Sequence, residues 1–257
     1  MTDKIQLTRD GFIATVTLNR PDKLNALDPE MLGGLETALA QLENDRDVRV
    51  VLLTGAGDRA FCVGADINAW AALEPLDMWR CWIRDGQRVF DRLARLRQPV
   101  IAVLNGYTFG GGLELALAAD LRLAAEEAEL AMPEVTIGTV PGWGGTQRLP
   151  ALIGPARAKQ MILTGSRVDV HTAERWGLVN DVVPRAALMD EARALAQQIA
   201  GNAPLSVQMA KQVIDGAGPV ASVALEALAG GLAASTGDGR EGVAAFRERR
   251  PAQFSGR

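Results

Sequence analysis

Two glutamates in apolar sequence are the residues best suited to acid-base chemistry. Glu114 lies in the segment LELALAAD, and Glu134 follows Met132 and Pro133 on the far side of an expected short hairpin. A carboxyl group in dry surroundings has a raised pKa and can exchange protons near neutral pH. One glutamate could take a proton from water while the other gives a proton to a carbon atom. Taken separately, Glu114 also fits a first-turn partner of the helix dipole, and Glu134 fits an ordinary loop acid.

Two glycine-bearing turns could bind a negatively charged oxygen beside these glutamates. The first turn covers residues 60–67 (AFCVGADI), and the second covers residues 105–114 (NGYTFGGGLE). Three glycines at 110–112 precede a helical run over 113–119, so free amides at a helix N-terminus favour negative charge there. Each such donor contributes ~3 kcal/mol to a transition state that develops an oxyanion. The alternative is that the glycines serve only tight turns and helix packing.

The composition leaves few other groups for catalysis. The 257 residues include one histidine, His171, and two cysteines, Cys62 and Cys81, which leaves no zinc cluster and no Ser-His-Asp triad to expect. Two cysteines fit free thiols in a reducing compartment better than a disulfide framework. The 27 basic residues are dispersed among 31 acidic ones, apart from a short cluster at 247–250, which argues against nucleic acid as the main partner.

The apolar content predicts a folded protein in the cytoplasm. Hydrophobic residues make up 48% of the chain, enough for one large domain or a domain with a small appendage. The first residues lack the basic end and apolar run of a secretory signal, and no stretch has the ~20 apolar residues that cross a bilayer. We therefore expect no membrane partner.

Strand and helix signals alternate through the first two thirds of the chain. Strands are expected at residues 4–9, 13–18, 48–54 and 99–104. The first two are joined at the turn-forming pair Asp10-Gly11, and the last two are apolar enough to be buried on both faces. Helices are expected at residues 29–44, 78–96, 186–200, 204–215 and 220–236.

A loosely repeated β-β-α unit emerges from this order, around residues 50–80 and again around 100–120. It predicts an α/β fold in which a coiled sheet is flanked by helices. Strand signals nearly vanish from residue 155. We therefore predict a core over residues 1–200 and a helical region over 201–257 that packs on the core or on a neighbouring subunit.

Five segments carry a resemblance to a known family. They are residues 19–27 (NRPDKLNAL), 60–67 (AFCVGADI), 105–120 (NGYTFGGGLELALAAD), 132–150 (MPEVTIGTVPGWGGTQRLP) and 177–183 (GLVNDVV). Together they resemble the crotonase superfamily, the enoyl-CoA hydratase/isomerase family, from about residue 13 to the C-terminus. The resemblance implies a crotonase-type spiral of β-β-α units with a helical C-terminal trimerisation region. It also implies a homotrimer, or a hexamer built as a dimer of trimers.

The resemblance assigns roles to individual residues. The amides of Ala65 and Gly111 match the oxyanion hole, Glu114 matches the glutamate that activates water, and Glu134 matches the one that protonates the alpha carbon. Coenzyme A is expected at Lys23, Leu24, Ala26, Ala65, Asp66 and Ile67, with basic help from residues 246–250. The chain departs from many hydratases at Asn68, where they have lysine, which leaves one phosphate contact in question.

The function implied is reversible hydration of a trans-2-enoyl-CoA in fatty acid metabolism, as in β-oxidation, without a metal or redox cofactor. Family members that only shift double bonds often keep just the second carboxylate, so the presence of both favours a hydratase. A Δ3,Δ2-enoyl-CoA isomerase and a non-catalytic acyl-CoA binding protein are the alternatives. The acyl group is left open, since a scaffold this versatile does not fix its substrate.

Several other residues have structural explanations that we favour. Asp66 is expected to order its turn, His171 to lie at the surface or cap a helix, and Cys62 to act as a small hydrophobe. Arg148 is expected to support the structure through an ion pair or carbonyl contacts. Four tryptophans could restrict the acyl pocket, although core or subunit packing is the better explanation for two of them, Trp79 and Trp82; the other two are Trp70 and Trp143.

Overall fold

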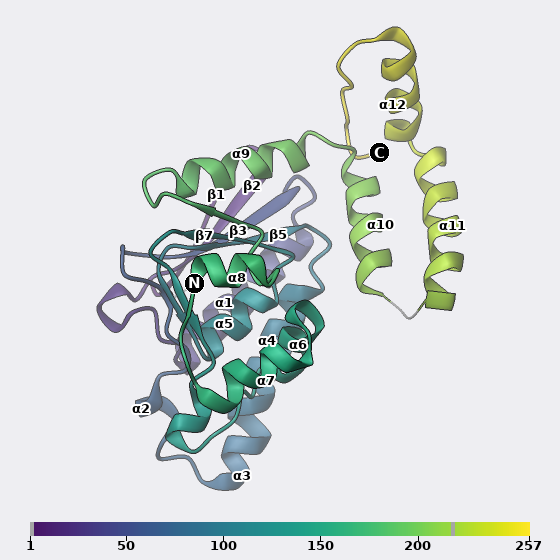
Figure 1. Cartoon of the computed structure of the whole chain (residues 1–257). Coiled ribbons are helices and arrows are strands. Elements are labelled where there is room, and N and C mark those ends of the chain that lie inside the picture. The colour runs from purple at the N-terminus through teal and green to yellow at the C-terminus, as the bar shows by residue number, and fades with distance from the viewer. Residues whose placement is uncertain (1–2, 217–218) are drawn as a thin grey trace.

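A six-stranded, largely parallel sheet lies at the centre of the structure, a computed structural model that describes residues 3–216 and 219–257 (Figure 1). Its strands, in spatial order, are β1 (Ile5–Asp10), β2 (Ile13–Leu18), β3 (Val50–Gly55), β5 (Val100–Leu104), β7 (Leu121–Ala125) and β10 (Asp181–Val183). β1 and β2 pair antiparallel across a tight turn in which Gly11 has a φ of 55°, and the remaining neighbours are parallel. The predicted hairpin is confirmed.

A second, smaller sheet contains β4 (Ala60–Cys62), β6 (Tyr107–Phe109), β8 (Glu129–Ala131) and β9 (Val168–Asp169), in that order. β4, β6 and β8 are parallel to one another, so their carboxyl ends meet at one edge. Each of these three strands directly follows a strand of the large sheet along the chain. The chain therefore passes from the large sheet to the small one three times.

Helices connect and cover the sheets. Before the last strand of the large sheet they are η1 (Pro21–Lys23), α1 (Pro29–Asn44), α2 (Ile67–Trp70), α3 (Pro75–Asp77), the π-helix η2 (Met78–Ile83), α4 (Arg84–Ala94), α5 (Gly111–Leu117), η3 (Glu134–Ile137), α6 (Gly145–Ile153), α7 (Pro155–Thr164) and α8 (Val170–Arg175). After it come α9 (Leu188–Ala200), α10 (Pro204–Asp215), α11 (Pro219–Ser235) and α12 (Gly237–Glu248). In the described part of the chain, no helix is both long and apolar enough to cross a membrane.

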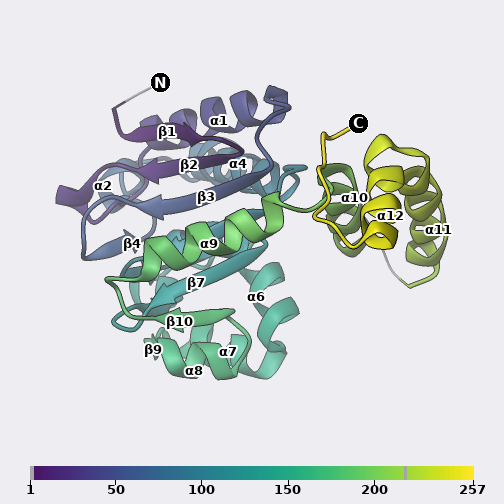
Figure 2. The same ribbon diagram turned by 90° about the horizontal axis from the view of Figure 1, so that it is seen from above.

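Both faces of the large sheet are covered, which explains why β3 and β5 are buried along their whole length. Val51 and Leu53 belong to a core cluster with the apolar faces of α1 and α4, whereas Val50 and Leu52 pack with α9. Figure 2 shows α9 lying across one face of the sheet, with α1 and α4 behind it. The prediction of strands buried on both sides is confirmed.

The spiral has one more turn than the sequence suggested. The strand pairs β3-β4 and β5-β6, each followed by helices, are the two predicted units. The third unit is β7-β8, which we had expected to be a hairpin. β7 pairs with β5 and β10, whereas β8 pairs with β6 and β9, so the two strands lie in different sheets. The hairpin prediction was wrong because the turn at residues 126–128 carries the chain from one sheet to the other.

The last three helices form an arm outside the body (Figures 1 and 2). The chain enters the arm after α9, near Gly201, where the sequence analysis divides it. Polar contacts of Lys211 and Phe254 tie the arm to the body, and Lys211 also donates to the Gln98 carbonyl at 3.3 Å. The Lys211 ammonium, which is buried, lies 2.8 Å from the Asp120 carboxylate, and the Arg49 guanidinium donates to the carbonyls of Ala200 and Phe254, 2.9 Å in each case.

Candidate active site

Three of the predicted site residues lie at the shared edge of the small sheet. Ala65, Gly111 and Glu134 each occur within three residues of the end of β4, β6 and β8, respectively. Because these strands are parallel, their following turns converge, and α5 carries Glu114 into the same space. All four residues line one cavity of about 230 Å³. The structure therefore brings together residues that lie up to 69 positions apart in the sequence, as Ala65 and Glu134 do.

The backbone amides of two cavity-lining residues, Ala65 and Gly111, have no hydrogen-bond acceptor in the described residues. Leu27 donates its N–H to the Gly64 carbonyl at 2.7 Å, and Asp66 donates to the Leu27 carbonyl at 2.8 Å, so the N–H of Ala65 between them points away from Leu27. Gly111 is the first residue of α5, and its N–H therefore has no acceptor within that helix. The two turns touch, because a Cβ placed on Gly111 would lie 3.4 Å from the Ala65 nitrogen.

The three glycines that precede Glu114 have separate tasks. Gly110 has a φ of 51°, and a Cβ there would lie 3.1 Å from Oε1 of Glu134. Gly111 presents the free amide. Gly112 lies against β4, because a Cβ on it would fall 2.1 Å from the Cys62 carbonyl oxygen. Close packing therefore explains Gly112, and the helix begins at Gly111 rather than at the expected residue 113.

Replacing Gly112 by alanine is expected to destabilise the protein by about 3 kcal/mol, because the added methyl meets rigid backbone that must move. Urea unfolding followed by circular dichroism measures this change in the free energy of unfolding. Gly33→Ala is the matched control. Gly33 lies exposed within α1, and a Cβ there has nothing within 4 Å. The control should raise stability by about 0.5–1 kcal/mol, and an equal effect of both substitutions would contradict the packing argument.

Glu114 is buried and held by backbone donors. Its Oε1 accepts hydrogen bonds from the N–H groups of Trp143 (2.7 Å) and Gly145 (2.8 Å). Burial raises the pKa of this carboxyl group, while these donors and the nearby Arg148 guanidinium act in the opposite direction. A Cβ on Gly145 would lie 2.3 Å from the Met132 methyl group and 3.0 Å from Glu114, so a side chain there would displace Met132 and crowd the Glu114 carboxyl group.

Glu134 differs from Glu114 in having no donors. Both of its carboxyl oxygens are buried, and neither has a hydrogen-bond partner among the described residues. Burial raises its pKa from 4.5 to about 7, and the Glu114 charge adds to the rise. An unpartnered buried carboxyl group is rare in proteins and requires an explanation. In this pair, the backbone donors stabilise a negative charge on Glu114, whereas Glu134 has no such donor from another residue.

Most of the remaining cavity wall is apolar, apart from Thr136 and Thr139. It contains Trp70, Met78, Trp82, Ile83, Ile137, Val140 and Trp143. Trp82 and Trp143 are buried and pack with their ring centroids 5.2 Å apart, whereas Trp79 is 59% exposed. The expectation of core or subunit packing is therefore confirmed for Trp82, whereas Trp79 does not pack in the core and its packing against a neighbouring subunit stays a prediction. Trp70 and Trp143 do line the pocket, as the sequence suggested.

The loop expected to bind coenzyme A lies beside the Ala65 turn. Lys23 is exposed at the end of η1, and Leu24 and Ala26 are half-buried. The Leu24 carbonyl accepts from the Val63 N–H at 3.2 Å, which places this loop alongside the turn that contains Ala65. Ile67 is half-exposed at the cavity wall.

Two residues that order this loop were missed in the sequence. Asn25 is fully buried with a φ of 57°, and its amide donates to the carbonyls of Ala56 and Ala60, 3.0 Å in each case. Arg20 donates to Asp66 at 2.8 Å and to the Ala26 carbonyl at 3.0 Å. Asparagine adopts positive φ more readily than most residues, and this preference was the only sequence signal for the role of Asn25 in the loop.

Asp66 orders its turn, as expected. Its side chain accepts from the Asn68 N–H at 3.0 Å and caps α2, and the Arg20 guanidinium holds its pKa below the ordinary value. It directly follows Ala65 in the sequence and already has protein partners. Asn68 is exposed at this turn.

The basic segment 246–250 is not close to these residues in the single chain. It ends α12 in the arm, whereas Asp66 caps α2, and Figure 1 shows α2 and α12 at opposite ends of the molecule. Arg250 is also paired with Glu241. The expected help with coenzyme A therefore does not come from this segment of the same chain.

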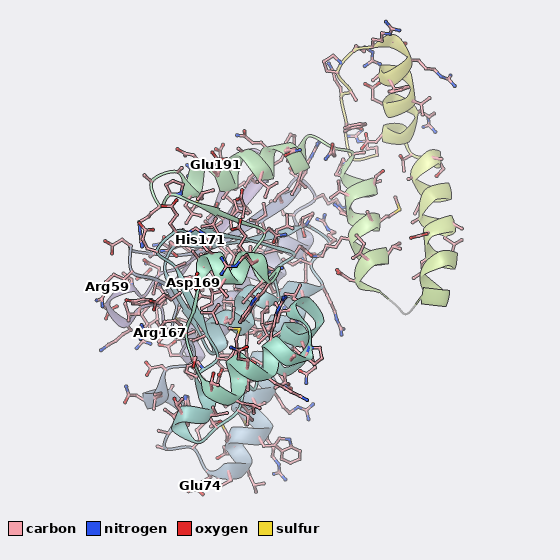
Figure 3. All side chains as sticks on the ribbon, viewed as in Figure 1. Arg59, Glu74, Arg167, Asp169, His171 and Glu191 are labelled. Carbon is pink, nitrogen blue, oxygen red and sulfur yellow. The ribbon has the colours of Figure 1, made fainter. Side chains whose placement is uncertain are left out.

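The remaining structural expectations are largely confirmed. His171 is exposed next to Asp169 (Figure 3), although Asp169, not His171, caps α8 by accepting from the Thr172 N–H at 2.9 Å. Cys62 is buried, which raises the pKa of its thiol to about 12. Arg148 contacts Asp91 and donates to the Trp143 carbonyl. In the described residues, no group of three histidine, cysteine or carboxylate side chains is placed to hold a metal ion.

Known proteins match this chain along nearly its whole length. It is 40% identical to a short-chain-enoyl-CoA hydratase of Clostridium acetobutylicum, covering 96% of each chain, and 42% identical to an (E)-benzylidenesuccinyl-CoA hydratase of Thauera aromatica, covering 98% and 99%. The crystal structure of an enoyl-CoA hydratase from Bacillus anthracis superposes with a TM-score of 0.96 at 38% identity, covering 99% of this chain and all of that one. The sequence model of the enoyl-CoA hydratase/isomerase family matches residues 8–257. The chain therefore belongs to the enoyl-CoA hydratase/isomerase family, and its fold is the crotonase fold.

Proposed function

We propose that this protein adds water reversibly across the double bond of a trans-2-enoyl-CoA thioester. The observation that carries the proposal is the pair of buried carboxyl groups, Glu114 and Glu134, which face one apolar cavity beside two free amides. Membership of the family supports the substrate class, an acyl-CoA.

The amides would act on the thioester carbonyl. When the N–H groups of Ala65 and Gly111 bind the carbonyl oxygen, these donors are already in place to stabilise the negative charge that develops on it. The α5 N-terminus adds its dipole at the same point. This stabilisation makes C3 of the enoyl group electrophilic, because the electrons of the double bond can move onto the oxygen.

The two carboxyl groups would divide the proton transfers. Glu114, as a carboxylate, takes a proton from water, and the water oxygen bonds to C3 while the double-bond electrons form the enolate. Glu134, as an acid, gives its proton to C2, and the carbonyl re-forms. The product carries hydroxyl on C3 and hydrogen on C2, and solvent restores the starting protonation of both glutamates. A pKa near 7 suits an acid that must hold its proton at neutral pH and release it during the reaction.

The test is direct turnover of crotonyl-CoA by the purified protein. Loss of the ultraviolet absorbance of the conjugated thioester, with formation of 3-hydroxybutyryl-CoA, supports the proposal. An isomerase would instead convert a 3-enoyl-CoA far faster than it hydrates a 2-enoyl-CoA. Tight binding of acyl-CoA thioesters with no turnover of either class would identify a binding protein and overturn the proposal.

A short acyl group fits this cavity best. The apolar space is about 230 Å³, and Trp82 and Trp143 are buried in its wall. One relative is named a short-chain-enoyl-CoA hydratase, and another, 37% identical, a crotonyl-CoA hydratase of Syntrophomonas wolfei. We expect kcat/KM to be at least about 10-fold lower for 2-decenoyl-CoA than for crotonyl-CoA, because a long chain must displace packed indoles. A panel of enoyl-CoA esters from four to ten carbons measures this, and a flat profile would contradict it.

We also propose that the arm packs against further copies of the chain, as a homotrimer or a hexamer. Ile214, Leu228 and Phe246 of the arm are each 70% exposed or more, which is unfavourable in a lone subunit. The free thiols of Cys62 and Cys81 support a reducing, cytoplasmic location. No metal or redox cofactor has a part in the proposed mechanism.

A further inference from the structure

Trp143 joins the wall of the cavity to the proposed base. Its backbone N–H donates to Oε1 of Glu114 at 2.7 Å, and Gly145, two residues further on, donates to the same oxygen at 2.8 Å. Trp143 lies in the loop that precedes α6 and Gly145 is the first residue of that helix, so the positions of both donors depend on whatever fixes this loop and helix start.

The Trp143 indole fills a slot between two helices that glycines leave open. A Cβ on Gly86 of α4 would lie 2.1 Å from its Nε1, and a Cβ on Gly111 of α5 would lie 2.8 Å from its Cε3 and Cζ3. The indole therefore touches the backbone of α4 on one side and the oxyanion amide residue on the other. No other side chain at position 143 would fill this slot as fully, because tryptophan is the largest residue.

Aromatic neighbours complete the slot. The rings of Trp82 and Phe90 lie with their centroids 5.2 Å from that of Trp143, and the indole N–H donates to the Trp82 carbonyl at 3.3 Å. Trp82 lies in the π-helix η2 and also lines the cavity. The acyl-pocket wall, the Trp143 loop and the Glu114 carboxyl group are therefore in continuous contact.

We propose that Trp143 is a positioning residue, whose indole fixes the backbone donors that orient Glu114 and supports the Gly111 amide. This inference rests on the proposed hydration. Packing restricts the loop to one position, so the proposed base and the oxyanion amides are held before substrate binds. Without the indole, the donors at 143 and 145 are free to move away from Glu114.

The pH dependence of the reaction reports this role. Donors to a carboxylate favour its charged form, so loosening them raises the pKa of Glu114, and the acid limb of the kcat/KM profile moves to higher pH. Two other charged groups act on Glu114 here, Glu134 across the cavity and Arg148 of α6. Both side chains are retained when Trp143 is replaced, but Arg148 donates to the Trp143 carbonyl and moves with the loop, so its loss acts in the same direction as loss of the donors. Water that enters in place of the indole acts in the opposite direction by relieving burial, so a shift to higher pH identifies the loosened loop.

The experiment compares Trp143→Ala and Trp143→Phe with the unmodified enzyme in crotonyl-CoA hydration from pH 5 to 9. We expect Trp143→Ala to lower kcat by about 10- to 100-fold, with a smaller change in KM and the acid limb at higher pH. Trp143→Phe keeps a ring in the slot and should recover most of the rate, which also provides a folded variant if the alanine form is unstable. Trp79→Ala is the matched control, since Trp79 is exposed and lies outside the cavity wall.

A double substitution tests the slot itself. Gly86→Ala alone should impair activity, because its methyl collides with the indole, but it should cause no further loss in the Trp143→Ala enzyme. An unshifted acid limb and undiminished kcat in Trp143→Ala would overturn the inference and leave hydration standing. Absence of crotonyl-CoA hydration by the unmodified protein would instead overturn the proposed function, and retention of hydration by Glu114→Gln would overturn only the role of Glu114 as the base, so these failures are distinct.

Discussion

Replacing Glu114 by glutamine is expected to lower kcat/KM for crotonyl-CoA hydration by about 10³-fold or more. A positioned general base contributes about 10²- to 10⁴-fold, and glutamine cannot accept the proton from water. The fold should survive, because the amide oxygen of glutamine can accept from the Trp143 and Gly145 N–H groups that bind Oε1 now. Loss of ultraviolet absorbance measures the rate, and circular dichroism confirms that the variant is folded.

The Glu114 variant also separates the two enzymatic functions. An isomerase that moves its proton through Glu134 alone would tolerate this change. If the unmodified protein hydrates crotonyl-CoA poorly, and Glu114→Gln still converts a 3-enoyl-CoA at a near-normal rate, the protein is an isomerase. Glu126→Gln is a suitable control, since Glu126 is an exposed acid on the turn between β7 and β8. Its rate should equal that of the unmodified protein.

Replacing Glu134 by glutamine should lower hydration by a similar factor, about 10³-fold, because no proton is then available for C2. The unmodified enzyme should lose kcat/KM as pH rises above about 7, where Glu134 loses its proton in the free enzyme. A rate that stays constant up to pH 9, or a glutamine variant with normal activity, would remove Glu134 from the mechanism.

Stability provides an independent measure of the Glu134 environment. Its folded pKa of about 7 lies above the ordinary 4.5, so the folded protein binds this proton more tightly than the unfolded chain. The associated stability is fully present below pH 4.5 and is lost as pH rises through 7. Glutamine has no such proton. As the pH is raised from 4.5 to 8, the free energy of unfolding of Glu134→Gln should therefore increase relative to that of the unmodified protein, by up to about 3 kcal/mol. Urea unfolding at both pH values measures the difference.

The parts of the site that lie in single continuous segments were predictable from the sequence. The segment at residues 60–67, which contains Ala65, and the segment with the glycines before Glu114 each combine a strand, a turn and a helix start within about ten residues. Their conformations could therefore be predicted from neighbouring residue types alone. The two buried strands were equally clear, because an apolar run with no polar face must be covered on both sides.

Features that depend on distant contacts were not predictable in the same way. Asn25 looks like an ordinary loop residue in the sequence, and Trp143 was expected only as a possible pocket residue. The structural roles of these two residues arise from Ala60 and Gly86, which lie 35 and 57 positions away. The β7-β8 turn has the length of a hairpin, and only the pairing with β5 and β6 shows that the strands separate. The positive charge of residues 246–250 suggested that they help to bind coenzyme A, but charge alone does not indicate where a segment lies in the fold.

The three parallel strands of the small sheet distribute the site among independent turns. The turn after β4 supplies one amide, the turn after β6 supplies the other, and the turn after β8 supplies Glu134, while Glu114 comes from a helix. Each group can therefore be altered during evolution without rebuilding the others. A lineage that lost Glu114 would still polarise a thioester and still have one proton donor, so a new reaction lies one substitution away from the existing one.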